Sequence, residues 1–183
     1  MYNLILIRGV SGSGKSTVAN IMTGLSPDTT LHLSTDFYFY PNYERTGKCD
    51  GGYNFNPSLL KMNHTKCINA ASEAMSKTWG QQKIFDEKAK IGSVNDLDVP
   101  KIKTIIVANT FTQEWEMKPY MNSAAWYDFD VHTIIVEKRH GHQNTHGVDA
   151  DAIKSQIDRF DVKLHSEEEH KIGQAPSYEE NKI

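Results

Sequence analysis

The run from Gly9 to Ser16, GVSGSGKS, matches the phosphate-binding pattern G-x-x-x-x-G-K-[ST] over its whole length. Its glycines permit backbone conformations that turn N–H groups inward toward an anion, and Lys15 adds a positive charge for the β- and γ-phosphates. The Ser16 hydroxyl is the expected protein ligand of Mg²⁺. This chemistry is the binding of ATP with Mg²⁺. The predicted cofactor-binding residues are Gly9, Gly12, Ser13, Gly14, Lys15, Ser16 and Thr17.

The surroundings of this loop agree with the motif. Residues 4–7 are an apolar run long enough for one buried strand, and residues 16–22 read as the start of a helix. Strand, glycine-rich turn and helix is the order in which a phosphate-binding loop occurs. The alternative, a chance match in a Gly/Ser-rich turn, is disfavoured by this context.

A second candidate is Asp36, which follows the second predicted strand at residues 31–34. In a doubly wound sheet the carboxyl ends of the strands meet in one crevice, so Asp36 would face the γ-phosphate. A carboxylate there can take a proton from an acceptor hydroxyl. Two alternatives stay open from the spacing alone: a surface aspartate at a strand end, or one that binds Mg²⁺ through water.

The elements that position these residues alternate along the chain. Strands are predicted at residues 4–8, 31–34, 105–108 and 131–136, and helices at 15–24, 58–78, 112–127 and 149–163. This alternation predicts an α/β fold: a P-loop NTPase three-layer sandwich with a mostly parallel sheet and helices on both faces. The second helix can bury a face, and two tryptophans of the third are expected in the core. These residues are Leu59, Met62, Cys67, Ala70 and Ala74, and Trp115 and Trp126.

Length and composition indicate one globular domain, residues 1–163, with an acidic and flexible tail at 164–183. Residues 80–101 resemble an insertion because they show little apolar periodicity. The net charge of −3 lies in the tail, and a neutral body does not suit a protein that coats duplex nucleic acid. We expect no membrane partner, since no apolar run is long enough to span a membrane. We expect a cytoplasmic location, since no signal peptide is evident and the isolated Cys49 and Cys67 fit a reducing compartment.

Several later segments strengthen the prediction of a kinase: "LSTDFYF", "YNFNPSLLKMNH", "NTFTQEWEMKPY" and "NTHGVDADAIKSQIDRFD". Together with "ILIRGVSGSGKST" they resemble, in family order, the P-loop kinases that include the 5′-kinase domain of phage-type polynucleotide kinase and stand-alone AAA-like kinase domains. The resemblance spans nearly the whole chain except residues 80–101 and the tail. It implies that Asp36 is the general base, and that Asn109 and Thr110 lie beside the acceptor pocket.

The resemblance also implies a lid over the phosphates at residues 138–147, where Arg139 would clamp the transferring phosphoryl group. Arg159 is a second candidate, although a salt bridge on a helix surface explains it equally well. The lid histidines, His140, His142 and His146, offer a metal site in principle, but phosphate contact or solvation explains them better because a fourth ligand is missing.

Two residues depart from the family pattern on the acceptor side. Ala108 replaces an acid, and Phe39 replaces the basic residue of the phage enzyme. Tyr38 and Tyr40 could stack on a base of the acceptor or could pack the loop onto the sheet.

The sequence therefore predicts an ATP-dependent kinase that phosphorylates a hydroxyl of a nucleic acid or nucleotide, first of all a polynucleotide 5′-hydroxyl. The alternatives are a kinase of a nucleoside, small molecule or modified base, and a non-catalytic, nucleotide-dependent binding module. Catalytic roles are predicted for Asp36, Lys15 and Arg139, and substrate binding for Asp36, Tyr38, Asn109 and Thr110.

Overall fold

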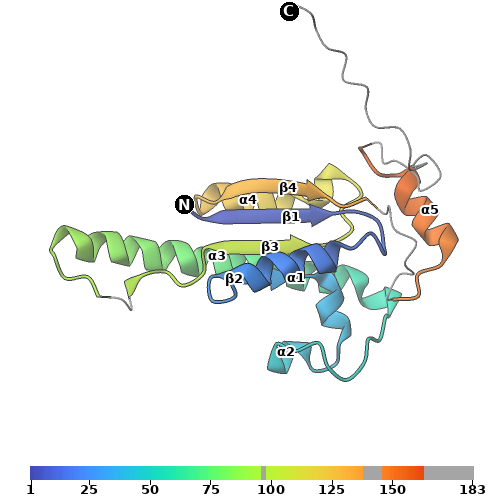
Figure 1. Cartoon of the computed structure of the whole chain (residues 1–183), viewed down its shortest axis with the longest axis horizontal. Coiled ribbons are helices and arrows are strands. Elements are labelled where there is room, and N and C mark those ends of the chain that lie inside the picture. The colour runs from blue at the N-terminus through green and yellow to red at the C-terminus, as the bar shows by residue number, and fades with distance from the viewer. Residues whose placement is uncertain (96–97, 138–145, 163–183) are drawn as a thin grey trace, which may run out of the picture.

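The computed structural model describes residues 1–95, 98–137 and 146–162. Its centre is a four-stranded parallel sheet in the order β2-β3-β1-β4, formed by β1 (Asn3–Arg8), β2 (Thr30–Leu33), β3 (Thr104–Ala108) and β4 (Asp130–Ile135). All four strands therefore end at the same edge (Figure 1). The predicted α/β fold is confirmed.

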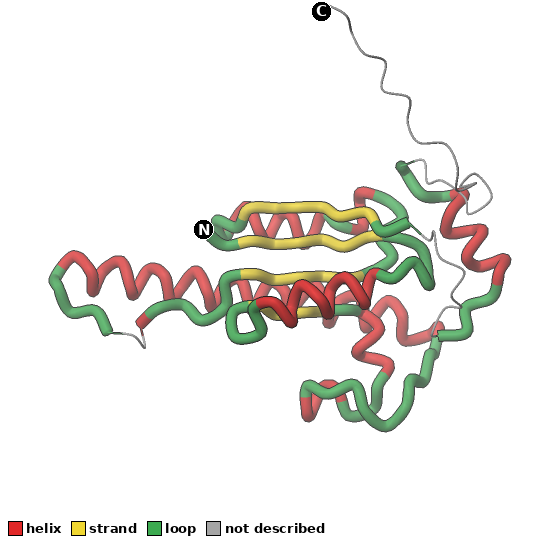
Figure 2. The backbone as a smooth tube through the Cα atoms, in the orientation of Figure 1, coloured by secondary structure: helices red, strands yellow, loops and turns green. Residues whose placement is uncertain are grey.

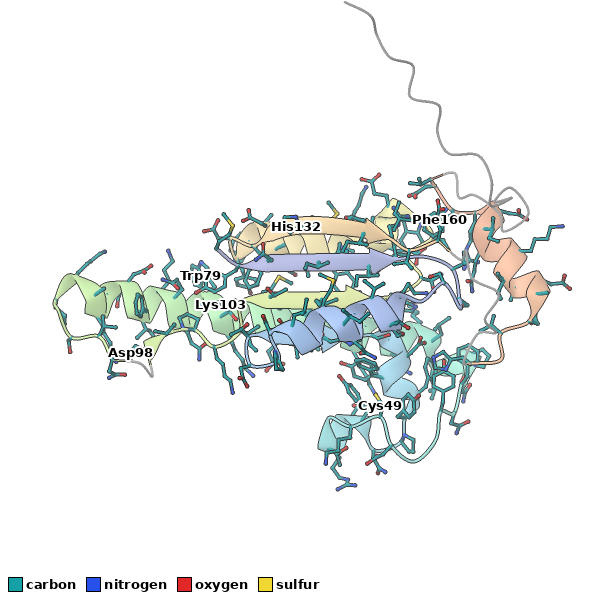
Figure 3. The ribbon with its side chains drawn as sticks, in the orientation of Figure 1. Cys49, Trp79, Asp98, Lys103, His132 and Phe160 are labelled. Carbon is teal, nitrogen blue, oxygen red and sulfur yellow. The ribbon has the colours of Figure 1, made fainter. Side chains whose placement is uncertain are left out.

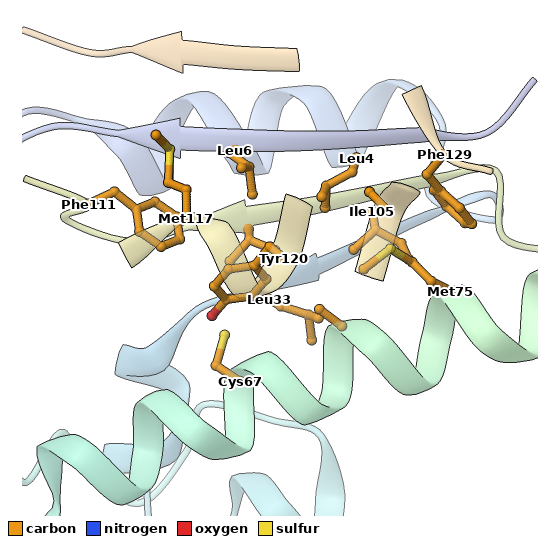
Figure 4. Close-up of a cluster of buried hydrophobic side chains, with 13 residues drawn as sticks. Leu4, Leu6, Leu33, Cys67, Met75, Ile105, Phe111, Met117, Tyr120 and Phe129 are labelled. Atoms are coloured by element: carbon orange, nitrogen blue, oxygen red, sulfur yellow. The ribbon is translucent and has the colours of Figure 1, made fainter. Parts of the chain in front are cut away.

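The two central strands are buried on both faces, because their alternating side chains contact different layers. Leu4 and Leu6 of β1 join a large cluster with residues of α3 (Leu60–Lys90) and α4 (Lys118–Trp126) (Figure 4). Ile7 of β1 and Ile106 of β3 face the other way and contact Ala19 of α1 (Lys15–Leu25). The molecule is thus a three-layer sandwich, with α1 on one face and α3 and α4 on the other.

Shorter elements connect these layers and carry much of the site (Figure 2). A 3-10 helix, η1 (Thr35–Phe39), follows β2 directly, and α2 (Tyr43–Thr46) comes next. The 3-10 turns η2 (Pro57–Leu59) and η4 (Glu114–Glu116) precede α3 and α4. The last described helix, α5 (Ala150–Asp158), is capped by Asp149, whose side chain accepts a hydrogen bond from the Ala152 N–H at 2.8 Å. Helix α5 lies beyond the carboxyl ends of the strands (Figure 1).

Helix α3 is longer than predicted and buries part of the predicted face, with Cys67 buried and Ala70 and Ala74 packed against the core. It continues to Lys90 instead of ending at Thr78, because the intervening residues are good helix formers without proline. An i,i+4 hydrogen bond of 2.6 Å from Gln82 to Asp86 lies in this extension. The predicted insertion at 80–101 therefore begins as helix. The buried positions are Asn63, Cys67, Ala71, Met75 and Thr78, whereas Leu59 and Met62 are exposed.

The prediction that both tryptophans belong to the core was wrong. Trp115 is 64% exposed and Trp126 is 79% exposed. The face of α4 that packs on the sheet is set by Tyr120 and Ala124, which are four residues apart, and Trp126 lies on another side of the helix. Trp115 instead donates its indole N–H to the side chain of Gln113 at 2.6 Å.

Helix α3 is long but too polar to cross a membrane. Although α3 has 31 residues, no helix in the described part of the chain combines the length and apolarity needed to cross a bilayer. Trp79 of α3 is 39% exposed and contacts the ring of Tyr127, and Asp98 follows the helix in the chain (Figure 3). The predicted tail at 164–183 and most of the predicted lid at 138–147, including Arg139, His140 and His142, lie outside the described residues.

Candidate active site

The phosphate-binding loop connects β1 to α1 at the carboxyl edge of the sheet. Gly12 and Gly14 adopt left-handed backbone angles, with φ of 77° and 96°. Gly9 has φ of 152°, and a Cβ placed there would lie 2.3 Å from the Val136 carbonyl oxygen. Only glycine fits this position, because the loop passes so close to the end of β4. The predicted loop residues therefore form one continuous turn that leads directly into the first residues of α1.

Lys15 lies in this turn with its charge only partly compensated. Its Nζ donates a hydrogen bond to the Val10 carbonyl at 2.9 Å. Burial lowers the pKa of Lys15 to about 8, and the negative charge of Asp36 opposes that shift. Lys15 and Asp36 are thus close enough to interact electrostatically, although they come from the ends of β1 and β2. A bound phosphate would give the buried ammonium the counter-charge it lacks.

Asp36 is positioned by the turn that ends β2. The Ser34 side chain caps η1 by accepting a hydrogen bond from the Asp36 N–H at 3.2 Å. The Asp36 side chain remains 47% exposed, so its carboxylate is accessible to a ligand. The hydroxyl of Tyr53 donates to Asp36 Oδ1 at 3.3 Å, and His146 Nε2 lies 3.8 Å from Asp36 Oδ2.

Asn109 is brought to the site, but its amide is used within the protein. Its Oδ1 accepts a hydrogen bond from the Thr35 N–H at 2.8 Å, and its Nδ2 donates to Cys67 Sγ at 3.8 Å. The residue is only 5% exposed. Asn109 therefore holds the start of η1 against β3 and α3. Thr110 is half-buried beside it, and its carbonyl accepts the Gly9 N–H at 3.0 Å, which ties the end of β3 to the phosphate-binding loop.

The aromatic residues after Asp36 mostly pack the segment onto the fold. Tyr38 packs against the main core cluster and donates its hydroxyl to the Lys66 carbonyl at 3.3 Å. Phe39 is 3% exposed, and Tyr40 contacts the ring of Tyr53 edge-on at 5.5 Å. Of the two predictions for Tyr38, packing of the segment onto the fold agrees with these contacts, and stacking on an acceptor stays a prediction.

A further histidine, His64 of α3, lies behind η1. Its Nδ1 is 3.2 Å from Thr35 Oγ1. Burial lowers the pKa of His64, while the charges of Glu116 and Asp36 oppose the shift. Glu116 is itself fixed by the Gln113 N–H at 3.0 Å and the Thr112 hydroxyl at 2.7 Å. His64 is therefore a largely neutral polar group between two acids.

Helix α5 is tied directly to the phosphate-binding loop. The Gln156 side chain accepts the Ser11 N–H at 2.7 Å and donates to the Ser11 hydroxyl at 3.1 Å. After α5, Asp161 pairs with Arg8 at 2.6 Å and accepts the Glu114 N–H at 2.5 Å. Arg159 donates to the Thr112 hydroxyl at 3.0 Å, so this candidate for phosphate contact links α5 to the loop after β3.

The sequence-based site did not include Arg8, Tyr53, His64 or Gln156. Each acts through a partner that is distant in the chain, so local spacing carried no signal for them. His146 was recognised only as a lid histidine, and its partner Asp36 is 110 positions away. The described residues contain no group of three or more His, Cys, Asp or Glu side chains suited to hold a metal ion.

Comparisons with known proteins address the family. NEDD4-binding protein 2 of Homo sapiens is 30% identical over 164 residues, which cover 86% of this chain but only 8% of that protein. An APS kinase CysC structure from Mycobacterium tuberculosis covers 88% of this chain and 98% of its own at 13% identity and a TM-score of 0.42. A sugar kinase from Janibacter sp. HTCC2649 covers 88% and 79% at 17% identity and a TM-score of 0.42.

A match at family level also covers most of the chain. It runs from residue 4 to residue 162 and so includes the phosphate-binding loop, Asp36, the loop after β3 and α5. The chain belongs to the AAA domain family.

Proposed function

We propose that this chain transfers the γ-phosphate of ATP to a hydroxyl group of a nucleic acid or nucleotide, with a polynucleotide 5′-hydroxyl as the preferred acceptor. One observation carries the proposal. A half-exposed carboxylate, Asp36, is held at the carboxyl edge of the sheet within electrostatic reach of Lys15. The Ser34 cap and the Tyr53 hydroxyl hold Asp36 in this position, and Asn109 fixes the preceding residue, Thr35.

One side of the site would bind the phosphates of ATP, and the other would activate the acceptor hydroxyl. The loop from Gly9 to Thr17, with Lys15, would bind the phosphates and neutralise charge on the transferring group. Asp36 would accept the proton of the acceptor hydroxyl as the acceptor oxygen bonds to the γ-phosphorus. The bond from the γ-phosphorus to the bridging oxygen breaks, and ADP leaves. Arg139 is proposed to contact the same phosphoryl group from the lid segment.

The donor set also suits Mg²⁺. Ser16 is exposed at the start of α1 and offers a hydroxyl oxygen, a hard donor of the kind that Mg²⁺ prefers. Mg²⁺ prefers a few such oxygens and completes its coordination with phosphate oxygens and water. Bound with ATP, it would supply charge neutralisation for the phosphates. Ser16 is the residue proposed to hold it.

A second acceptor class is favoured by Phe39. Phe39 is buried at the position where the phage polynucleotide kinase, which this chain resembles, has a basic residue. The acceptor side therefore lacks one positive charge that could bind a phosphodiester group of the acceptor. A nucleoside, a modified base or another small hydroxyl compound would not require that cation. A non-catalytic binding module is favoured instead by the engagement of Arg8 and Arg159 in contacts within the protein.

The test is phosphate transfer from γ-labelled ATP with Mg²⁺ to a panel of acceptors: 5′-hydroxyl DNA and RNA oligomers, hydroxymethylated DNA, and nucleosides. Asp36→Asn should lower kcat by about 10²- to 10⁴-fold, as removal of a general base does, with the Kd for ATP unchanged. Asp28→Asn, the same change at an exposed position before β2, is the control.

Three outcomes separate the candidates. Label on an oligomer end, lost in Asp36→Asn, supports the polynucleotide kinase. Label on a nucleoside or modified base moves the substrate class and keeps the mechanism. ATP binding without transfer to any acceptor contradicts the proposal and supports the binding module.

A further inference from the structure

Tyr53 and His146 meet over Asp36 from two distant segments. Tyr53 belongs to the loop after α2, and His146 lies just before α5. Their ring centroids are 3.9 Å apart and the planes are inclined by 33°, so the two rings are in close, tilted contact. The Tyr53 hydroxyl donates to Asp36 Oδ1 at 3.3 Å, and His146 Nε2 is 3.8 Å from Asp36 Oδ2. Each oxygen of the carboxylate therefore has one neighbour from this pair.

Tyr53 is braced on its other side by the segment that carries Asp36. Its ring contacts Phe39 at 5.9 Å and Tyr40 at 5.5 Å, both edge-on. The Phe39 carbonyl accepts the Asn54 N–H at 3.0 Å. Since Asp36 and Phe39 both belong to η1, these contacts join the loop of Tyr53 and the helix of Asp36 into one unit.

The phenol is also kept in the form that can donate. Burial and, after it, the neighbouring carboxylate of Asp36 raise the pKa of Tyr53 well above its usual range. Tyr53 therefore stays protonated at neutral pH. A carboxylate that is half exposed on a one-turn helix would otherwise sample several rotamers, whereas proton transfer requires a fixed distance to the acceptor.

We propose that Tyr53 is a positioning residue for the general base Asp36, and that His146 locks Tyr53 in place by stacking on it. The proposal rests on the phosphotransferase function proposed above. Tyr53 holds Oδ1, so Oδ2 receives the proton of the acceptor hydroxyl while the acceptor oxygen bonds to the γ-phosphorus and ADP leaves. His146 lies next to Oδ2 and borders the side from which the acceptor hydroxyl would approach.

Kinetics with the best acceptor of the panel test the positioning role. Tyr53→Phe keeps the ring and removes the hydroxyl, and it should lower kcat about tenfold while the Kd for ATP and the KM for ATP stay within twofold. His146→Ala should lower kcat similarly, whereas His146→Phe, which preserves stacking, should recover most of it. Tyr43→Phe is the matched control, because Tyr43 contacts the rings of Phe37 and Tyr38 instead. Wild-type kcat in Tyr53→Phe overturns the proposal.

A second measurement does not depend on transfer. Thermal unfolding of Asp36→Ala, Tyr53→Phe and the double variant forms a double-mutant cycle. The proposal expects Tyr53→Phe to lower Tm when Asp36 is present and to have no effect when it is absent. Additive shifts overturn the proposal whether or not the chain is a kinase. Coupled shifts in a chain that labels no acceptor support the Asp36–Tyr53 contact and refute the proposed function instead.

Discussion

Arg8 offers the sharpest test of how the site is supported. Its side chain is only 5% exposed, and it lies one residue before Gly9. The guanidinium donates to the Phe111 carbonyl at 3.0 Å, pairs with Asp161 at 2.6 Å and lies over the Phe160 ring at 4.6 Å. Asp161 supplies the one carboxylate among these three contacts. Asp161→Asn therefore leaves a buried cation without its counter-charge.

The loss of folding stability in Asp161→Asn can be estimated from the burial of the Arg8–Asp161 ion pair. Removing one partner of a fully buried ion pair costs about 3–5 kcal/mol, but Asp161 is 32% exposed, so solvent screening reduces the loss to about 2–3 kcal/mol. For a chain of this size that corresponds to a fall in Tm of roughly 4–12 °C. Asparagine still offers one oxygen to Arg8, so Asp161→Ala should be the more destabilising of the two.

Differential scanning calorimetry or urea unfolding measures the effect. Asp158→Asn is the control, because it removes the same charge from an exposed position at the end of α5 and should change stability by less than about 0.5 kcal/mol. ATP binding should weaken in Asp161→Asn as well, because Asp161 anchors the segment whose Gln156 holds Ser11 of the phosphate-binding loop. Equal stability of the Asp161 and Asp158 variants would refute the argument that Arg8 needs this partner.

Two further predictions concern the phosphate-binding loop. Burial lowers the pKa of Lys15 to about 8, so the free protein loses this charge above that pH. The Kd for ATP should therefore rise toward tenfold per pH unit, and calorimetry in two buffers should show proton uptake on binding. A flat Kd between pH 8 and 9 would contradict the prediction, and Lys15→Arg should remove the pH dependence. Gly9→Ala should abolish ATP binding, because the alanine Cβ would lie 2.3 Å from the Val136 carbonyl oxygen. Titration with a fluorescent nucleotide measures the effect. Gly24→Ala, at a position with open space, is the control and should bind ATP normally.

The loop motif, the strands and the helix starts could be predicted because each depends on neighbours in sequence. Gly14 and Lys15 mark the start of α1, and Asp149 caps α5, as local patterns require. The position of Asp36 could be predicted for the same reason, since it follows an apolar strand. The length of α3 was missed because its second half is held by helical propensity, while the prediction relied on apolar periodicity.

The supporting contacts could not be predicted, because they depend on sheet order. The order β2-β3-β1-β4 puts β3 between the strands that lead to Asp36 and to the phosphate-binding loop. Asn109, at the end of β3, can therefore bond Thr35 on one side, while Thr110 bonds Gly9 on the other. Nothing in the separate segments specifies this arrangement. It follows only when the strands have paired.

The two departures from the family pattern can now be explained by packing. Ala108 is 3% exposed and lies in the cluster of Ile7, Ala19 and Ile106 beneath α1, where a carboxylate would be buried among apolar side chains at a large cost. Phe39 is equally buried and braces Tyr53. Neither position faces the open side of Asp36 in this chain. Among the described residues, Tyr53 and His146 contact the Asp36 carboxylate and Lys15 lies within electrostatic reach of it. Discrimination among acceptors should therefore depend strongly on the shape and stacking of the group next to the hydroxyl.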